Sequence, residues 1–429
     1  MGIEPAAPRA VAPLAQMPLR ALLTHAADDP AASGLAREGG AAFVSPSLRA
    51  YLIAAVADAA PEEPVIVVAG DDRSARDLAA DLRAWLEPRA VRFYPSRGVA
   101  YESHLAPPPH LVGLRVAALD ALVGGAGAPV VVASAVALSE KVPDPGLRPH
   151  GLRLARGDLV DLDELAEELV AAGYERVEQV DDRGQFAVRG GLLDLYPATE
   201  ERAVRIDLFD VEIESLRWFS TFTQRSLGEA EAVEIAPAAE LAPEHRELAE
   251  IAALEDADER PDVAELLPVE SFRAVLDLAP PSARVVVAAQ EDVDPALDDL
   301  WQDVTAAFHD EDAHHLYVSP DAVRQGLDAR THVRLTSVPG DHAVEFSAQA
   351  ADTAARSVRD AEPELEKLVR SGYRTVVAWG RRGEGERAAF NLDRLTPDWL
   401  GDHVAPGPGL SFATAGLRDG FVAAGLSLA

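Results

Sequence analysis

The chain has 429 residues without a cysteine, and 48% of them are hydrophobic, which fits several globular domains and excludes disulfides, thiolate zinc sites and iron–sulfur clusters. Its 72 acidic residues outnumber its 39 Lys and Arg residues, and the net charge of −33 disfavours tight, independent binding of DNA, which needs a basic surface. No apolar run of about 18 residues occurs, so we expect no membrane span, and the lack of cysteine fits a cytoplasmic protein.

The first part of the chain alternates strands and helices. Residues 1–17 are rich in Pro and Ala and are predicted to be disordered. Residues 18–150 contain continuous apolar runs at 64–69 and 129–134, which are typical of strands buried on both faces. An amphipathic helix is predicted over 73–86. Strands separated by helices predict an α/β domain with a mainly parallel sheet.

Residues 151–237 show a different pattern, in which short apolar–polar alternations are broken at Gly190-Gly191, Pro197 and Asp210-Val211. This pattern predicts a small antiparallel sheet with tight turns, preceded by one helix at 159–172. The sheet also carries arginines in a very acidic chain, and an arginine-bearing sheet without catalytic residues is typical of a docking surface. We expect the following apolar residues in its core: Leu192, Leu193, Leu195, Phe209, Ile213 and Leu216.

The rest of the chain returns to helical and α/β patterns. Residues 238–330 contain an apolar strand at 283–288 and a helix at 294–308. Residues 331–429 are predicted to form a further small α/β domain. Its expected elements are a helix at 349–371, a strand at 374–379, a helix at 385–395 and a final strand within 420–429.

A family resemblance rests on three consecutive segments of the β-rich region. Gly184–Pro197 reads GQFAVRGGLLDLYP, Arg205–Asp210 reads RIDLFD, and Glu212–Arg217 reads EIESLR. Together they resemble the UvrB-homology module of the bacterial transcription-repair coupling factors. The excision protein UvrB shares this pattern but usually carries Arg where this chain has Ala187. The chain departs from the family at Val211, where Asp or Gly is common.

The resemblance implies an α/β fold with a degenerate RecA- or helicase-like parallel-sheet domain, formed by domain 1a (residues 18–150) and domain 1b (residues 238–330). A small β-rich, α+β domain 2 (residues 151–237) is inserted into it, and a small α/β domain (residues 331–429) follows. The family's proteins are longer and continue into an RNA-polymerase-interacting domain and two motor domains. We therefore expect this chain to correspond to their N-terminal part and to be a monomer.

For function, the resemblance implies that domain 2 binds UvrA, the damage-recognition ATPase, and that the chain itself is not an enzyme and needs no cofactor. The residues that match the shared motif are Arg176, Phe186, Arg189 and Arg205. Phe186 would be an apolar anchor, and the arginines would form bidentate pairs with carboxylates of the partner. Phe186 alternates with Val188, so a core position is the alternative for it. ATP, magnesium, RNA polymerase and duplex DNA would be bound only by the family's further domains.

Hydrolysis of ATP needs a phosphate-binding loop, with glycines, a Lys for the phosphates and a Ser or Thr for magnesium. The pattern GxxxxGK followed by Ser or Thr does not occur. By the resemblance the loop would lie near residues 36–43, which retain only two glycines; a short loop between helices fits this segment equally well.

Three alternatives remain open from the sequence. A nucleotide hydrolase related to UvrB would need a nonstandard phosphate site, for which Gly380–Glu386 is the candidate because it follows a strand and precedes a helix. His309–His315 contains metal-ligand residue types, although a charged surface loop fits it better. An acidic regulator that mimics the charge of DNA is the third alternative.

Overall fold

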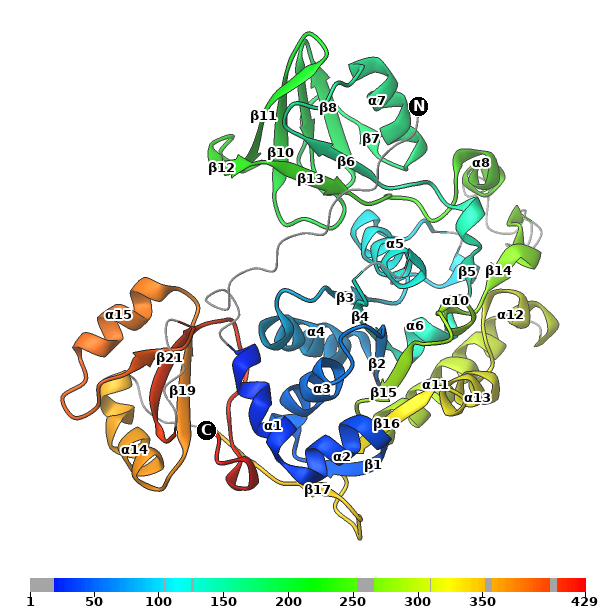
Figure 1. Ribbon diagram of the computed structural model, residues 1–429. Helices are drawn as coiled ribbons and strands as arrows, with labels where there is room; N and C mark the ends of the chain where they lie inside the picture. Colours follow the sequence, from blue (N-terminus) through cyan, green and yellow to red (C-terminus); the bar gives the residue numbers. More distant parts are fainter. Residues whose placement is uncertain are drawn as a thin grey trace, which may run out of the picture.

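The computed structural model describes residues 19–103, 105–124, 127–252, 266–308, 310–351, 357–401 and 407–429. The disorder expected for residues 1–17 therefore lies outside the described residues. Figure 1 shows a large body, a small β domain (residues 152–235) above it, and a terminal unit (residues 349–429) beside it. None of the described helices is long and apolar enough to cross a membrane.

The body is built on a seven-stranded parallel sheet with the strand order β17-β1-β16-β15-β2-β4-β3. Every residue of β2 and β4 is buried, as their continuous apolar sequences predict. This sheet and the inserted β domain confirm the predicted α/β fold. The strands are β1 (Gly40–Val44), β2 (Val65–Ala69), β3 (Val91–Tyr94), β4 (Val130–Ser134), β15 (Arg284–Val287), β16 (Thr331–Thr336) and β17 (Glu345–Phe346).

Helices cover both faces of this sheet, because alternate residues of each strand point to opposite sides. Val67 and Val132 pack in one core cluster, whereas Ile66 and Val131 pack in the other. The helices of the body and its edge are α1 (Thr24–Asp28), α2 (Pro30–Glu38), α3 (Arg49–Asp58), α4 (Asp72–Leu86), α5 (Pro109–Gly124), α6 (Ala135–Ser139), α8 (Pro243–Ala252), α10 (Val275–Leu278), α11 (Gln290–Ala307), α12 (Asp310–Leu316) and α13 (Pro320–Asp328). A short ribbon pairs β5 (Val142–Pro143) with β14 (Phe272–Arg273).

The body extends beyond residue 330, where the sequence analysis placed the start of the last domain. Strand β16 begins at Thr331 and lies between β15 and β1, so it is an inner strand of the main sheet. The alternation of apolar and polar residues in β16 does not indicate whether this strand completes the main sheet or begins a second sheet.

The small β domain has a six-stranded sheet with the order β12-β11-β10-β9-β8-β7, antiparallel except for the β7–β8 pair. The predicted turns at Gly190-Gly191 and Asp210-Val211 connect neighbouring strands, and Asp210 has a φ of 58°. The chain enters through β6 (Leu152–Ala155) and leaves through β13 (Ala232–Ile235), which pair with each other. The other elements are α7 (Leu162–Ala171), β7 (Glu175–Arg176), β8 (Gln185–Arg189), β9 (Leu192–Leu195), β10 (Ala203–Phe209), β11 (Glu212–Phe219) and β12 (Ser226–Ala230).

The terminal unit has a parallel three-stranded sheet with the order β19-β21-β20. Its first helix begins at Val358, capped by Ser357, and not at residue 349, because Gln349 and Ala350 form a strand. The buried ring of Phe421 lies beside Tyr51 and Trp85 of the body. The elements are β18 (Gln349–Ala350), α14 (Val358–Arg370), β19 (Arg374–Trp379), α15 (Arg382–Phe390), β20 (Asp398–Trp399), β21 (Gly409–Thr414) and β22 (Phe421–Val422), the last followed by a 3-10 turn at Ala424–Leu426.

Candidate protein-binding surface

The six-stranded sheet of the small β domain has two chemically different faces. On one face Phe186, Leu195 and Val204 are cross-strand neighbours, and they pack with α7 in an apolar core. The alternation of side chains along each strand places the next residues of the same strands on the opposite face.

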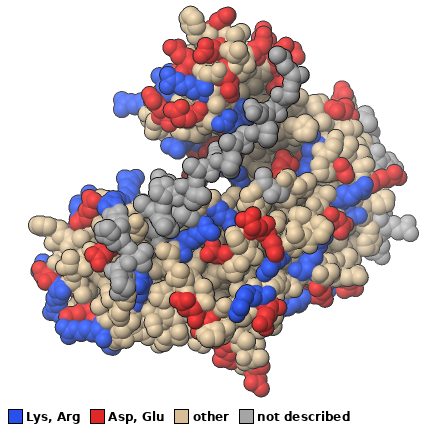
Figure 2. All heavy atoms as spheres, viewed as in Figure 1, with Lys and Arg blue, Asp and Glu red and all other residues tan. Residues whose placement is uncertain are grey.

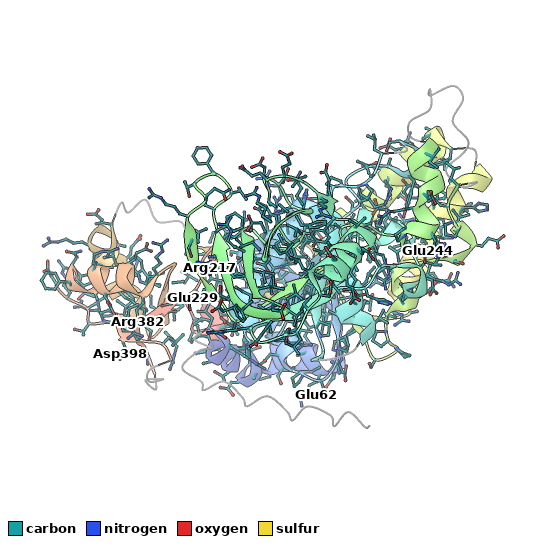
Figure 3. The ribbon with its side chains drawn as sticks, turned by 90° about the horizontal axis from the view of Figure 1, so that it is seen from above. Glu62, Arg217, Glu229, Glu244, Arg382 and Asp398 are labelled. Carbon is teal, nitrogen blue, oxygen red and sulfur yellow. The ribbon has the colours of Figure 1, made fainter. Side chains whose placement is uncertain are left out.

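The opposite face carries a row of charged residues. Asp194, Arg205, Arg217 and Glu229 follow one another across β9, β10, β11 and β12. Arg205 donates two hydrogen bonds to Asp194, at 2.6 and 2.7 Å, and these bonds raise the pKa of the arginine. Arg217 pairs with Asp207 of β10 and lies beside Glu229 in Figure 3. The charges of this face therefore largely neutralise one another within the sheet.

Two of the four residues predicted to bind a partner are exposed at one edge of this sheet. Arg176 lies on the edge strand β7, and Arg189 ends the neighbouring β8 and donates a hydrogen bond to the backbone oxygen of Glu178. Arg205 is two strands away, with a side chain that is only 25% exposed because of its pair with Asp194. Figure 2 shows basic and acidic side chains intermixed on the small β domain.

Phe186 does not have the exposed position that an apolar anchor needs. Its relative exposure is 0%, and it packs in the core of the small β domain beneath α7. Phe186 therefore has the core position that the sequence analysis gave as the alternative. Phe209 was expected in the core, and this prediction is wrong. Its side chain is 77% exposed, because Phe209 is the last residue of β10 before the Asp210 turn.

The loop that would bind phosphate in a nucleotide-binding sheet follows the first strand of that sheet. In this structure that position is Ser45–Leu48, between β1 and α3, and not residues 36–43, which form the end of α2 and most of β1. The position contains Pro46 and no lysine. Arg49 donates a 2.6 Å hydrogen bond to Ser337, so neighbouring loops occupy this site with their own side chains.

The other candidate sites also have structural explanations. Gly380–Glu386 is mostly helix, since α15 begins at Arg382; its first turn carries Glu384, which would oppose a bound anion. Arg382 covers the ring of Trp399, and Figure 3 shows it in the same unit as Asp398. His309 lies outside the described residues, the following segment is helix α12, and no group of three metal-ligand residues occurs among the described residues.

A buried ionic cluster, formed by Arg97, Arg115, Glu140 and Glu240, lies where the chain returns from the small β domain to the body. Arg115 donates hydrogen bonds to Glu140 at 2.6 Å and to Glu240 at 3.2 Å, and Arg97 donates to Glu240 at 2.8 Å. Burial would raise the pKa of Glu240, but the two arginines outweigh it and hold the pKa below its usual value. Burial raises the pKa of Glu140 to about 7 against the attraction of the same arginines.

Close backbone contacts also hold the small β domain against α5. A Cβ on Gly113 of α5 would lie 2.5 Å from the Cβ of Ala198, and a Cβ on Gly184 would lie 2.7 Å from that of Pro109. Larger side chains at these two glycines would not fit without movement of their neighbours. The sheet edge with Arg176 and Arg189 is therefore presented from a firmly seated domain.

Comparison with known proteins agrees with this division of the chain. Residues 152–241 match the family described as the UvrB interaction domain. The transcription-repair-coupling factor of Bacillus subtilis is 34% identical over 47% of this chain and 17% of its own length. That of Mycobacterium bovis is 29% identical over 90% of this chain and 36% of its own length, and that of Escherichia coli is 32% identical over 41% and 15%.

The chain thus spans about a third or less of the length of these curated relatives. Their similarity covers the body as well as the small β domain, since one of them aligns with 90% of the chain. The chain is therefore similar to the transcription-repair coupling factors, and its residues 152–241 match the UvrB interaction domain.

Proposed function

We propose that this chain is a non-catalytic module that recruits UvrA during transcription-coupled nucleotide excision repair. The observation that carries the proposal is a UvrB interaction domain, residues 152–241, that presents two exposed arginines on a firmly seated sheet edge. Homology to transcription-repair coupling factors supports the repair context. The chain would work in the cytoplasm as a monomer and without a nucleotide. ATP, magnesium, RNA polymerase and duplex DNA would be bound by other parts of the longer homologues.

In this proposal Arg176 and Arg189 make the principal polar contacts with the partner. Among the described residues, Arg176 forms no ion pair with a carboxylate, and Arg189 donates only to a backbone oxygen, so both can donate hydrogen bonds to carboxylates of a partner. A guanidinium group binds a carboxylate through two parallel hydrogen bonds, which gives geometric specificity as well as affinity.

Arg205 and Phe186 have supporting parts in the same proposal. The bond between Arg205 and Asp194 leaves a quarter of the arginine side chain exposed, so its contact with a partner is smaller. Phe186 lies beside Arg176 in the β7–β8 pair, and its side chain packs in the core, which fixes the position of β8.

The test is a calorimetric titration of the chain with its cognate UvrA. We expect Arg189→Ala to cost about 2–4 kcal/mol, which weakens binding roughly 30- to 700-fold, because a desolvated arginine contact is lost. The control is Arg359→Ala, which removes another exposed arginine, in this case from the terminal unit. Absence of binding by the folded wild-type chain, or equal affinities of Arg189→Ala and the wild type, would overturn the proposal.

A further inference from the structure

Three large apolar side chains are exposed together at one end of the small β domain. Leu159 is 75% exposed, Phe209 is 77% exposed and Val211 is 42% exposed. We call these three residues the apolar tip. They come together because Leu159 forms a β-bridge with Glu212, and the backbone N–H of Val160 donates a 2.7 Å hydrogen bond to the oxygen of Val211. Exposed apolar side chains that are grouped together mark interaction sites more often than ones that are scattered singly.

Backbone hydrogen bonds hold the apolar tip in one conformation. The N–H of Ile213 donates to Asp158 at 2.9 Å, and the N–H of Gly157 donates to Ile213 at 2.8 Å. The turn between β10 and β11 is tight, with Asp210 in the left-handed region. A partner that binds this surface would therefore lose little conformational entropy in ordering it.

The core of the small β domain does not use the apolar tip. Ile206 and Ile213, in the same two strands, are fully buried and already occupy the space under the sheet. Phe209 and Val211 stand at the end of those strands, beyond that core. Their exposure is therefore not explained by packing within the described chain.

The apolar tip lies at the same end of the sheet as Arg189. Arg189 precedes the Gly190-Gly191 turn, and the oxygen of Gly191 accepts a 2.8 Å hydrogen bond from Leu208 of β10. Strands β8 and β10 are two positions apart in the sheet, which corresponds to about 10 Å. A protein partner of ordinary size buries roughly 800 Å² on each side and would cover both places.

The charges around the apolar tip indicate the chemistry of the surface that covers it. Asp210, Glu212 and Glu214 are exposed next to the tip, and Asp158 is half-buried there. They outnumber the exposed Arg156, which lines the same hollow as Glu214 and Leu208. A protein interface typically combines an apolar centre with a polar rim. The complementary surface is therefore an apolar pocket with basic groups on its rim.

We propose that the apolar tip inserts into an apolar, basic-rimmed pocket on UvrA, beside the contact made by Arg189. This inference rests on the proposed function, and it assigns to Phe209, Leu159 and Val211 the anchoring part that the sequence suggested for Phe186. Phe209 is the centre of the contact, because it is the largest of the three side chains and the most exposed.

The experiment is a titration of cognate UvrA with the wild-type chain and with Phe209→Ser and Leu159→Ser. We expect each variant to weaken binding by about tenfold or more, since a buried aromatic or aliphatic anchor is lost. The matched control is Phe222→Ser, because Phe222 is 96% exposed but lies beyond the other end of β11. That variant should bind within about twofold of the wild type. Circular dichroism should show no loss of structure in any of them.

The outcomes separate this inference from the proposed function. If Arg189→Ala weakens binding and both tip variants bind like the wild type, the apolar tip is not an anchor, although the proposed function stands. If the wild-type chain does not bind UvrA, the proposed function fails first, and the partner assigned to the tip fails with it. Sedimentation velocity tests whether the tip serves self-association instead. A wild-type dimer that Phe209→Ser converts to a monomer, with unchanged affinity for UvrA, would overturn the inference.

Discussion

Replacement of Arg115 by methionine should destabilise the contact between the body and the small β domain severely. Arg115 is 1% exposed and donates hydrogen bonds to Glu140, to Glu240 and, at 2.8 Å, to the backbone oxygen of Pro95. Methionine keeps much of the volume but leaves two carboxylates in a buried site with only Arg97 as a counterion. Breaking a buried ion pair in this way costs about 3–5 kcal/mol.

The appropriate assay is amide hydrogen exchange, because a chain with several domains has no single two-state free energy of unfolding. Exchange should accelerate in the segments that hold the ionic cluster, around residues 95–97 and 238–242, and stay unchanged in the β10–β11 hairpin. The control is Arg324→Met, which removes ion pairs to Asp294 and Asp298 from a side chain that is 31% exposed. Exposed pairs of this kind contribute under about 1 kcal/mol.

The result that would refute this reasoning is an equal, small effect of Arg115→Met and Arg324→Met on local exchange. It would mean that water or movement of the chain solvates the carboxylates as soon as the arginine is removed. The cluster would then not be the element that fixes the small β domain to the body.

Two further predictions concern stability. The folded-state pKa of Glu140, about 7, lies above its usual 4.5, so this group contributes stability that is present below pH 4.5 and is lost as pH rises through 7. The midpoint of the thermal transition in which the body unfolds should fall over that range, by the equivalent of at most about 3 kcal/mol. It should fall less with pH in Glu140→Gln, and an equal dependence of the two midpoints on pH would contradict the prediction. Gly184→Ala places a Cβ 2.7 Å from Pro109 at a φ of 81°, whereas a Cβ at Gly190, with a φ of 62°, has no neighbour within 4 Å. Gly184→Ala should therefore lower the thermal midpoint more than Gly190→Ala. Equal shifts of the two midpoints would show that the contact with Pro109 relaxes freely.

The sequence predicted the main strands of the body because their burial leaves a direct trace. Strand β2 is apolar at every position and β4 at every position before Ser134, and burial on both faces explains such runs. The membership of β16 left no such trace, because its alternating pattern fits either an inner strand covered by polar loops at its ends or the edge of a new sheet. The pairing partners of a strand depend on the rest of the chain, and local sequence does not encode them.

The candidate site was predicted in part for a related reason. Period-two alternation correctly assigns Phe186 and Ala187 to opposite faces of β8, but it does not tell which face is covered by a helix. Packing of α7 decides this, and it buries Phe186. For Phe209 the deciding feature is its place at the strand end beside Asp210, where it is exposed. The turn residues Asp210 and Val211, directly after Phe209, were the signal in the sequence that Phe209 ends its strand.

The polar groups at the carboxyl edge of the main sheet are the reason why we propose a binding function for the inserted sheet and not for this edge. That edge is where α/β folds bind ligands. Here the Asp72 carboxylate accepts hydrogen bonds from the hydroxyls of Ser96 and Ser134, at 2.6 and 2.5 Å, and Arg49 binds Ser337. A nucleotide would have to break these internal bonds without a lysine to replace them. The small β domain differs because Arg176, Arg189 and the apolar tip have groups that the described chain leaves available. Because the described groups at this edge of the main sheet are bonded to one another, we place the proposed binding on the inserted sheet.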